Sequence, residues 1–267
     1  MKSNYIKISF GEFLKSIKKD VYNINTCFTF AIYDLKIKFA RTQIGFFWNL
    51  VQVMIWIGSL YLVFFSYFGI KEESFLLYIS IGIILFFFFE TTVNEACTLL
   101  QINRVTILSL NTSILFFFLR NFIKNLIIFF INFILVLCLL IFFGKIDYTL
   151  FLFLIYFPIY AMSVFFISFS AGLISTRYRD FNPIINVALR VLFILTPIFW
   201  TKKIVEDREY LVDYNPLFHL IELIRNPLMQ KDISFINLNI SICVLVFSLI
   251  ISFFIYFNNF KIIKHWI

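Results

Sequence analysis

The sequence predicts an all-α polytopic membrane protein with six transmembrane helices, an N-terminal amphipathic interface helix and short outer re-entrant helices between spans five and six. Of its 267 residues, 61% are hydrophobic and only 14% are charged, against about 45 to 50% and about 25% in an ordinary soluble domain. Six apolar stretches are long enough to cross a bilayer, and Lys and Arg gather beside alternate ends of them. The chain therefore divides into cytoplasmic interface helices over residues 1–44 and a six-helix transmembrane domain over residues 45–267.

Two helical segments that are not spans come first. The earlier one alternates apolar and charged residues at helical spacing, which is typical of a helix lying in the headgroup plane. Its apolar residues are Ile6, Phe10, Phe13, Leu14, Ile17 and Val21, and its charged ones are Lys7, Glu12, Lys15, Lys18 and Lys19. The second segment, about residues 26–41, carries Asp34, Lys36, Lys38 and Arg41 towards its end. It is either a general basic anchor or a specific lipid-phosphate site.

The transmembrane spans are predicted from hydrophobic length. A helix needs roughly 20 apolar residues to cross the hydrocarbon layer, where only a helix satisfies its own backbone hydrogen bonds. Six stretches meet this requirement, over about residues 45–69, 75–96, 122–143, 148–175, 182–200 and 233–257.

The orientation follows from the basic residues beside the spans, because basic loops near helix ends stay in the cytoplasm. With a cytoplasmic N-terminus, that side holds 15 of the 23 Lys and Arg residues, the outer side holds 7, and Arg190 falls inside a span. We therefore expect a multi-pass protein with both termini in the cytoplasm. The first 25 residues are charged throughout, so no cleavable signal peptide is expected.

The outer segment between spans five and six, residues 201–234, contains two Asn-Pro pairs, Asn215-Pro216 and Asn226-Pro227. Each pair is a helix-start signal, with Asn capping and Pro in the first turn. A helix from Pro216 to Arg225 would be only about 15 Å long, too short to cross. We expect it to lie at the outer interface or to dip in and return.

Several classes of chemistry have no sequence support. The cysteines have no metal-ligand spacing, and the chain lacks HExxH, GxSxG and a phosphate-binding loop. We therefore expect no catalytic residue, metal or cofactor in this chain, and any ATP and Mg to be bound by a partner. The net charge of +8 is attributed to topology and lipid headgroups, so nucleic acid is not an expected partner and membrane lipids are.

Two ionisable residues, Glu90 and Arg190, fall within predicted spans two and five, where a charge is costly and marks a candidate functional site. Both lie roughly 10 Å from the expected cytoplasmic ends of their spans. We hypothesise that they pair, within one chain or across a dimer. The alternatives are a pair that only fixes helix packing, contact of Arg190 with a substrate phosphate, and snorkelling.

Aromatic residues in the spans are candidates for lining a path, since their rings stack without demanding one stereochemistry. They are Trp56, Tyr61, Tyr67 and Trp200. The alternative for each is an interfacial or core aromatic. The 40 Phe residues are not taken as sites, because AT-rich codons can explain them. Asn49, Gln52, Asn125 and Asn132 are expected to make interhelical hydrogen bonds.

Three segments in matching order resemble the membrane subunit of ABC-2 type polysaccharide exporters. They are YDLKIKFARTQIGFFW (residues 33–48), GLISTRYRD (172–180), and Asn215-Pro216 with Arg225. The first is similar to the family's interface helix and Leu-Gly loop, the second to its Arg-Tyr-Arg-Asp turn, and the third to its outer re-entrant gate helices. Tyr33 stands where the family usually has Arg, and Ile44 where it usually has Leu.

The resemblance implies the permease of an ATP-driven exporter of lipid-linked O-antigen, teichoic acid or capsule in the bacterial cytoplasmic membrane. It implies a homodimer bound to two copies of an ATP-binding cassette subunit. Arg41, Gly45 and Trp48 would receive the diphosphate end of the substrate, because Arg offers a forked donor and Gly lets backbone approach closely. The alternative for these three is an anchor, a helix-start glycine and an interfacial Trp.

The resemblance also assigns the remaining site residues. ATPase coupling would involve Arg104, Arg177, Arg179 and Asp180, and the outer gate Asn215, Pro216, Arg225, Asn226 and Pro227. The alternative for residues 100–112 around Arg104 is an ordinary basic loop. Two other functions stay open: an ABC-2 exporter of a drug or small lipid, and a membrane transferase acting on polyprenyl-phosphate substrates.

Overall fold

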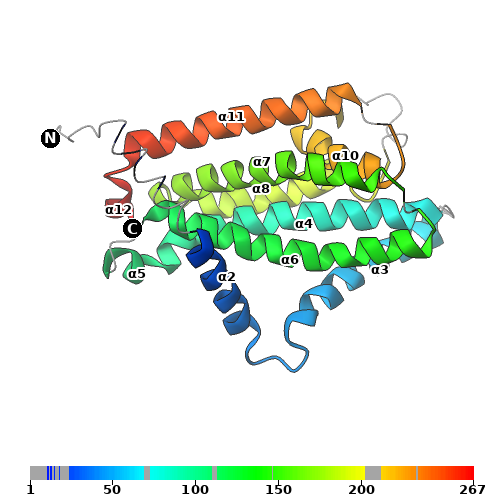
Figure 1. Cartoon of the computed structure of the whole chain (residues 1–267), viewed down its shortest axis with the longest axis horizontal. Helices are drawn as coiled ribbons and strands as arrows, with labels where there is room; N and C mark the ends of the chain where they lie inside the picture. Colours follow the sequence, from blue (N-terminus) through cyan, green and yellow to red (C-terminus); the bar gives the residue numbers. More distant parts are fainter. Residues whose placement is uncertain are drawn as a thin grey trace.

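The computed structural model describes residues 11, 13, 15, 18, 24–68, 73–109, 113–145, 147–201, 212–232 and 234–267. Within these ranges the chain forms long helices that run along one common axis (Figure 1). The helices are α2 (Ile24–Phe39), α3 (Trp48–Phe68), α4 (Glu73–Ile102), α5 (Arg104–Ser109), α6 (Ile114–Phe142), α7 (Leu150–Arg177), α8 (Phe181–Leu195), α10 (Pro216–Leu228), α11 (Phe235–Asn259) and α12 (Ile263–Trp266), with a 3-10 turn, η1 (Gly45–Phe47), before α3.

Five helices, α3, α4, α6, α7 and α11, are long and apolar enough to cross a membrane. The all-α polytopic prediction is therefore confirmed at this level. The predicted fifth span, residues 182–200, is instead the 15-residue helix α8 followed by a non-helical stretch. Pro197 has no backbone N–H and biases Thr196 towards its observed extended conformation, so the helix ends at Leu195.

Two predicted span boundaries are too narrow. Helix α4 continues to Ile102 rather than 96, and α6 begins at Ile114 rather than 122. The extra turns of α6 carry Arg120, whose charge interrupts the apolar run just before the predicted start of the span at residue 122. These turns are helical despite the charge, because a long basic side chain can pack its apolar stem along the helix and place its charged end in a polar environment.

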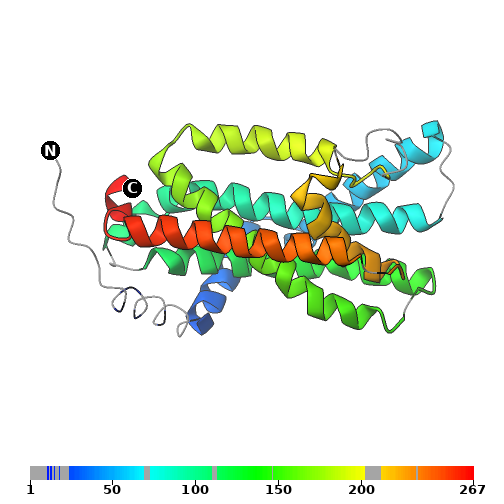
Figure 2. The same ribbon diagram turned by 90° about the horizontal axis from the view of Figure 1, so that it is seen from above.

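Helix α4 is at the centre of the bundle and packs against α6 and α7 (Figure 2). In its most apolar stretch 78% of the residues are buried by the rest of the chain, against 11% for α3. Stacked phenylalanines join α6 to α7, with Phe133 and Phe153 centroids 4.5 Å apart and Phe129 and Phe157 centroids 4.8 Å apart. The Phe excess thus serves core packing at these positions.

Helices α2 and α3 form a V that projects from the bundle, joined at its tip by residues 40–47 (Figure 1). Gly45 takes φ +61° in this turn, a left-handed conformation that glycine adopts readily. Helix α2 runs steeply across the long axis and packs on α6 through Cys27, Ala31 and Leu35, while its large apolar residues Phe28 and Ile37 stay exposed.

The two ends of the bundle differ. One end, here called the α5 end, holds α5, the turn between α7 and α8, and α12 (Figure 1). The other, the α10 end, holds α10 and the start of α11 (Figure 1). Most of the predicted interface helix at residues 6–21 lies outside the described residues. Its Phe13 is fully buried at the α5 end, with centroids 5.2 Å from Phe257 and 5.4 Å from Phe260.

Candidate functional site: a charged cavity and a buried arginine

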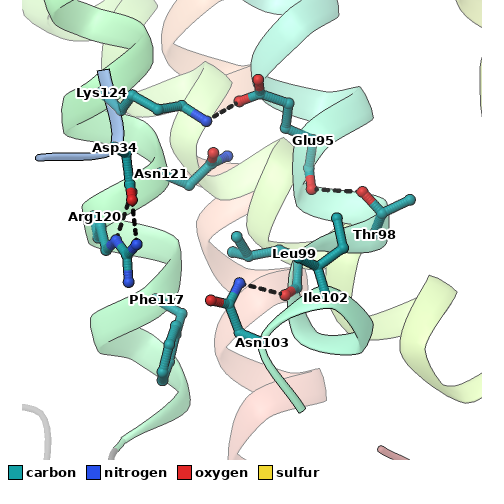
Figure 3. A pocket seen from close by; sticks show the side chains of 10 residues that line it. All are labelled: Asp34, Glu95, Thr98, Leu99, Ile102, Asn103, Phe117, Arg120, Asn121 and Lys124. Atoms are coloured by element: carbon teal, nitrogen blue, oxygen red, sulfur yellow. Dashed lines mark hydrogen bonds and ion pairs between the residues drawn. The ribbon is translucent and has the colours of Figure 1, made fainter. Parts of the chain in front are cut away.

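A cavity of about 240 Å³ opens between α2, α4 and α6 near the α5 end (Figure 3). Charged and amide side chains make up much of its wall. It is lined by Asp34, Glu95, Thr98, Leu99, Ile102, Asn103, Phe117, Arg120, Asn121 and Lys124. The depth of the cavity follows from helix length, because Glu95 lies seven residues before the end of α4, about 10 Å along the axis.

Arg120 of α6 and Asp34 of α2 form a two-pronged ion pair across this cavity (Figure 3). Arg120 Nε donates to Asp34 Oδ2 at 2.6 Å, and Nη2 donates to Oδ1. The guanidinium carbon also lies 5.5 Å from the centroid of Phe30. Planar guanidinium and carboxylate groups match in this fork geometry, so the pair fixes α2 against α6 in one register.

Glu95 of α4 is the second charged centre of the cavity. Its Oε2 accepts from Lys124 Nζ at 2.7 Å and from Asn125 Nδ2 at 2.8 Å, and its Oε1 lies 3.9 Å from Lys38 Nζ. Glu95 therefore joins α2, α4 and α6, and it compensates part of the positive charge that Lys38 and Lys124 bring to one place.

A smaller cavity of about 90 Å³ continues from Glu95 along α3, α4 and α6. Its polar wall contains the four amides predicted to make interhelical hydrogen bonds, Asn49, Gln52, Asn125 and Asn132. Asn125 makes such a bond with Glu95, whereas the buried Oδ1 of Asn132 has no partner among the described residues. The two cavities have Glu95 in common, and the smaller one forms a polar seam beside α3.

Sequence reasoning counted Arg120 and Lys124 only as topology signals, placed Lys38 in a segment predicted to be a basic anchor or a lipid-phosphate site, and did not single out Glu95. A usable signal was present, since Glu95 fell inside predicted span two, where ionisable residues mark functional sites. The predicted span ended one residue later, at Ala96, and only Glu90 was named as a candidate within it. The six further residues of α4 bring Glu95 into the wall of the cavity.

Arg225 of α10 is the largest fully buried side chain in the described part of the chain, with 1% exposure. Its Nη1 donates to the Pro197 carbonyl at 2.8 Å and to Glu222 Oε1 at 2.8 Å. Its Cζ lies 3.8 Å from the centroid of Tyr78 on α4. Gly82 is required beside it, because a Cβ there would overlap the guanidinium. Sequence reasoning placed Arg225 in the outer gate and missed its partners.

Helix α10 begins as predicted at Pro216, with Asn215 Oδ1 accepting from Leu217 N at 3.0 Å and Asn215 Nδ2 donating to Thr196 Oγ1 at 2.8 Å. The second pair, Asn226-Pro227, does not start a helix, which corrects the prediction. Pro227 lies in the last turn of α10, where the burial of Leu228 keeps the segment helical.

The α10 helix is packed deep within its end of the bundle, against α4, α7 and α11. His219 ties it to neighbouring segments, with Nδ1 2.8 Å from Asn237 Oδ1 and Nε2 2.8 Å from the Asp213 carbonyl. Its 13 residues span about 20 Å, less than the roughly 30 Å of hydrocarbon. The helix is thus too short to cross the hydrocarbon layer and lies wholly at the α10 end of the bundle.

Glu90 and Arg190 lie on the packed helices α4 and α8 and attract each other electrostatically. No nitrogen–oxygen contact within 4.0 Å joins them in the described single chain. Arg190 is exposed on α8. Pairing across a dimer therefore stays a prediction.

The substrate-loop candidates lie at the tip of the V. Arg41 and Trp48 are exposed and Gly45 is half-buried, and no atom of the described residues lies within 4 Å of where a Cβ would stand at Gly45. Phe39 and Phe46 close the turn edge to face, with centroids 5.5 Å apart. Within the described residues Arg41 is exposed at this turn, and its role in receiving a headgroup stays a prediction.

The coupling candidates gather at the α5 end. Arg104 is exposed at the start of α5, and Arg179 and Asp180 are exposed in the turn that leads into α8. Arg177 stacks between two rings, with its Cζ 5.2 Å from the Tyr178 centroid and 5.3 Å from the Trp266 centroid. Asp180 is the N-cap residue of α8 but makes no side-chain capping bond.

The aromatic candidates that the structure describes are partly exposed, and Trp56 packs on neighbouring rings. Trp56 contacts Phe87 and Phe193 edge to face at 6.1 and 6.4 Å and stays 45% exposed. Trp200 Nε1 donates to the Ile194 carbonyl at 3.0 Å. Tyr61 is half-buried, and the side chain of Tyr67 lies outside the described residues.

Chemically, the α5-end cavity offers cationic donors, carboxylates and amides at one place, which suits the binding of a charged group. Within the described ranges, no group of three or more His, Cys, Asp or Glu could hold a metal ion. Comparison with protein-family models and with curated proteins finds no match for this chain in either set.

Proposed function

We propose that the chain is the membrane-spanning subunit of an ATP-driven exporter that moves a lipid-linked polysaccharide across the bacterial cytoplasmic membrane. O-antigen or a teichoic-acid-like polymer is the proposed cargo. In this proposal two copies of the chain form the pathway and two copies of a separate ATP-binding subunit supply the energy.

The observation that carries the proposal is the position of two helices too short to cross, α5 and α10, at opposite ends of the long helices (Figure 1). An exporter of this kind needs an exposed contact for its ATPase at one end and a closure at the other. Exposed Arg104 and Arg179 lie at the α5 end, whereas α10 is buried within the other end. This agrees with the roles that the sequence resemblance assigns to them.

The surface of α3 adds support for a second copy. Its apolar stretch is only 11% buried, and Met54, Ile55 and Leu62 are exposed on it. On its bundle side α3 borders the polar seam with Asn49 and Gln52. If the α3 helices of two copies meet through their exposed apolar faces, the polar residues on their bundle sides lie next to that contact. This arrangement suits a path for a polar polymer.

Copurification tests the proposal. The tagged chain, expressed in its native host and purified in mild detergent, should bring down a Walker-motif ATPase in equal amount, measured by quantitative mass spectrometry. Arg104→Glu and Arg179→Glu should each lower this recovery severalfold. Lys231→Glu, an equal charge reversal at an exposed residue of the α10 end, is the matched control.

Recovery of the chain alone, with no ATPase under conditions that keep it folded, would reject the exporter assignment. Equal losses in all three variants would reject coupling through the α5 end. Conversion of a polyprenyl-phosphate substrate by the chain alone would favour the transferase alternative.

A further inference from the structure

We propose that the cavity between α2, α4 and α6 binds the headgroup of a membrane phospholipid that carries both a phosphate and an N–H donor, of the phosphoethanolamine type. This inference depends on the membrane-spanning helices and not on the proposed export function. Its site residues are Asp34, Glu95, Arg120, Asn121 and Lys124, none of which belongs to the substrate loop at Arg41, Gly45 and Trp48.

The cavity lies at the depth of lipid phosphates. Helix α4 has 30 residues and is about 45 Å long, close to the full 40 to 45 Å of a bilayer with its headgroups. Glu95 and Arg120 lie about 10 Å and 9 Å from the α5-end termini of α4 and α6. That depth corresponds to the boundary between headgroups and hydrocarbon.

The cations of the wall keep donors for a phosphate. Arg120 and Lys124 line the cavity together with Asp34 and Glu95, so the charges of the wall balance. Lys38 lies in the wall of the smaller cavity, 3.9 Å from Glu95, and adds one positive charge nearby. Arg120 uses Nε and Nη2 on Asp34. Its Nη1 makes no hydrogen bond within the described residues. The Lys124 ammonium has three N–H donors and contacts Glu95 with one of them. Both cations therefore have donors left for phosphate oxygens.

An unpartnered acceptor favours a donor on the same ligand. Asn121 is 4% exposed, and its Oδ1 lines the cavity without a hydrogen-bond partner among the described residues (Figure 3). A buried acceptor without a partner costs about 1 to 3 kcal/mol, so such groups normally have a ligand or water. An ammonium group would satisfy it, with Asp34 and Glu95 as neighbouring carboxylates.

The cavity is large enough and open to lipid. At about 30 Å³ per water in the liquid, 240 Å³ holds roughly eight waters, enough room for a phosphate with a short amine arm. Asp34, Arg120 and Glu95 keep 26%, 21% and 32% side-chain exposure, so the wall can be reached from outside. Helix α2, which supplies Asp34 to the wall, also exposes Phe28 and Ile37, whose side chains offer apolar contact for acyl chains.

Native mass spectrometry on the delipidated full chain tests this site. Dioleoyl phosphatidylethanolamine should bind with roughly fivefold or higher affinity than dioleoyl phosphatidylcholine, whose methylated amine lacks N–H donors. Asn121→Leu, close in size and uncharged, should abolish this preference, and Lys124→Gln should weaken both lipids. Lys261→Gln, at an exposed residue of the same end, should change neither.

Three results would overturn the proposal. They are equal binding of the two lipids by the wild-type chain, an unchanged preference in Asn121→Leu, and displacement of the ethanolamine lipid by millimolar inorganic phosphate. The last would identify a soluble phosphate as the occupant. Melting of each variant in detergent separates loss of lipid binding from loss of folding, and Asn121→Leu should melt no lower than the wild type because it removes an unpartnered acceptor.

Discussion

The guanidinium of Arg225 lies flat enough against Tyr78 to bring its Cζ within 3.8 Å of the ring centroid, and both side chains bond the same carbonyl, that of Pro197. Tyr78 donates to it at 3.0 Å and also to the Trp200 carbonyl at 3.1 Å. Residues from α4 and α10 thus hold the non-helical stretch after α8. Carbonyls that a longer α8 would have bonded internally are satisfied here by side chains.

Gly82→Ala should destabilise the chain, because the new methyl would occupy the place of the Arg225 guanidinium, which is fixed by its other contacts. We expect a cost of about 1 to 3 kcal/mol, typical of overpacking in a filled core, measured as a lower midpoint of thermal unfolding in detergent. Gly58→Ala is the control, since nothing lies within 4 Å of a Cβ there. A midpoint as high for Gly82→Ala as for Gly58→Ala would contradict the described position of Arg225.

Arg225→Met should lower the free energy of unfolding more than the double change Arg225→Met with Glu222→Gln does. The single change leaves the Glu222 carboxylate in a buried place without its cation, for which a loss of about 3 to 5 kcal/mol is typical. The double change removes both charges and should recover part of that loss. Thermal unfolding of Arg225→Met, Glu222→Gln and the double variant side by side checks this, and an additive loss in the double variant would show that the two charges do not depend on each other.

Asp34→Asn should loosen α2 from α6, because the amide has no negative charge and only one acceptor oxygen for the two donors of Arg120. Limited trypsin digestion in detergent would measure it through cleavage after Lys36, Lys38 and Arg41. Since the pair is partly exposed, we expect cleavage about two to five times faster. Asp147→Asn, at an exposed aspartate far along the chain, serves as control, and equal rates in both variants would mean that the fork does not hold α2.

Arg41→Ala should abolish export while leaving membrane insertion and ATPase recovery unchanged, if this exposed guanidinium receives the substrate diphosphate. Surface polymer, detected by antibody or gel, is the readout. The neighbouring exposed Gln43→Ala should export normally. Unimpaired export by Arg41→Ala would remove the substrate-loop hypothesis while leaving the rest of the exporter proposal to the copurification test.

Sequence predicted the long helices well, because hydrophobic length follows directly from the thickness of the bilayer. It also gave the start of α10, where Asn215 caps and Pro216 fills the first turn as expected. It failed where a charge interrupts an apolar run, as Arg120 does in α6, and where a proline ends one, as Pro197 does after α8. Whether a helix continues there depends on tertiary partners.

The charged cavity could not be predicted from the sequence, because it too depends on tertiary packing. Asp34 and Arg120 are 86 residues apart, and nothing local in the sequence connects them. Only the packing of α2 on α6 does so. The pairing of Glu95 with Lys124 and Asn125 likewise needs the antiparallel arrangement of α4 and α6, which places residues far apart in the chain at one depth.

The central position of α4 also bears on biogenesis. A ribosome delivers α4 to the membrane before α6 and α7, the two helices that later surround it. During that interval the sides of α4 face lipid. Its residues from Phe75 to Phe89 are almost all apolar, so their exposure to lipid carries little free-energy penalty. Glu95, by contrast, has no cation from α6 until that helix arrives. Before then its nearest cation among the described residues is Lys38 of α2, at 3.9 Å, so the arrival of Lys124 at 2.7 Å supplies the closer of the two cations that compensate this carboxylate.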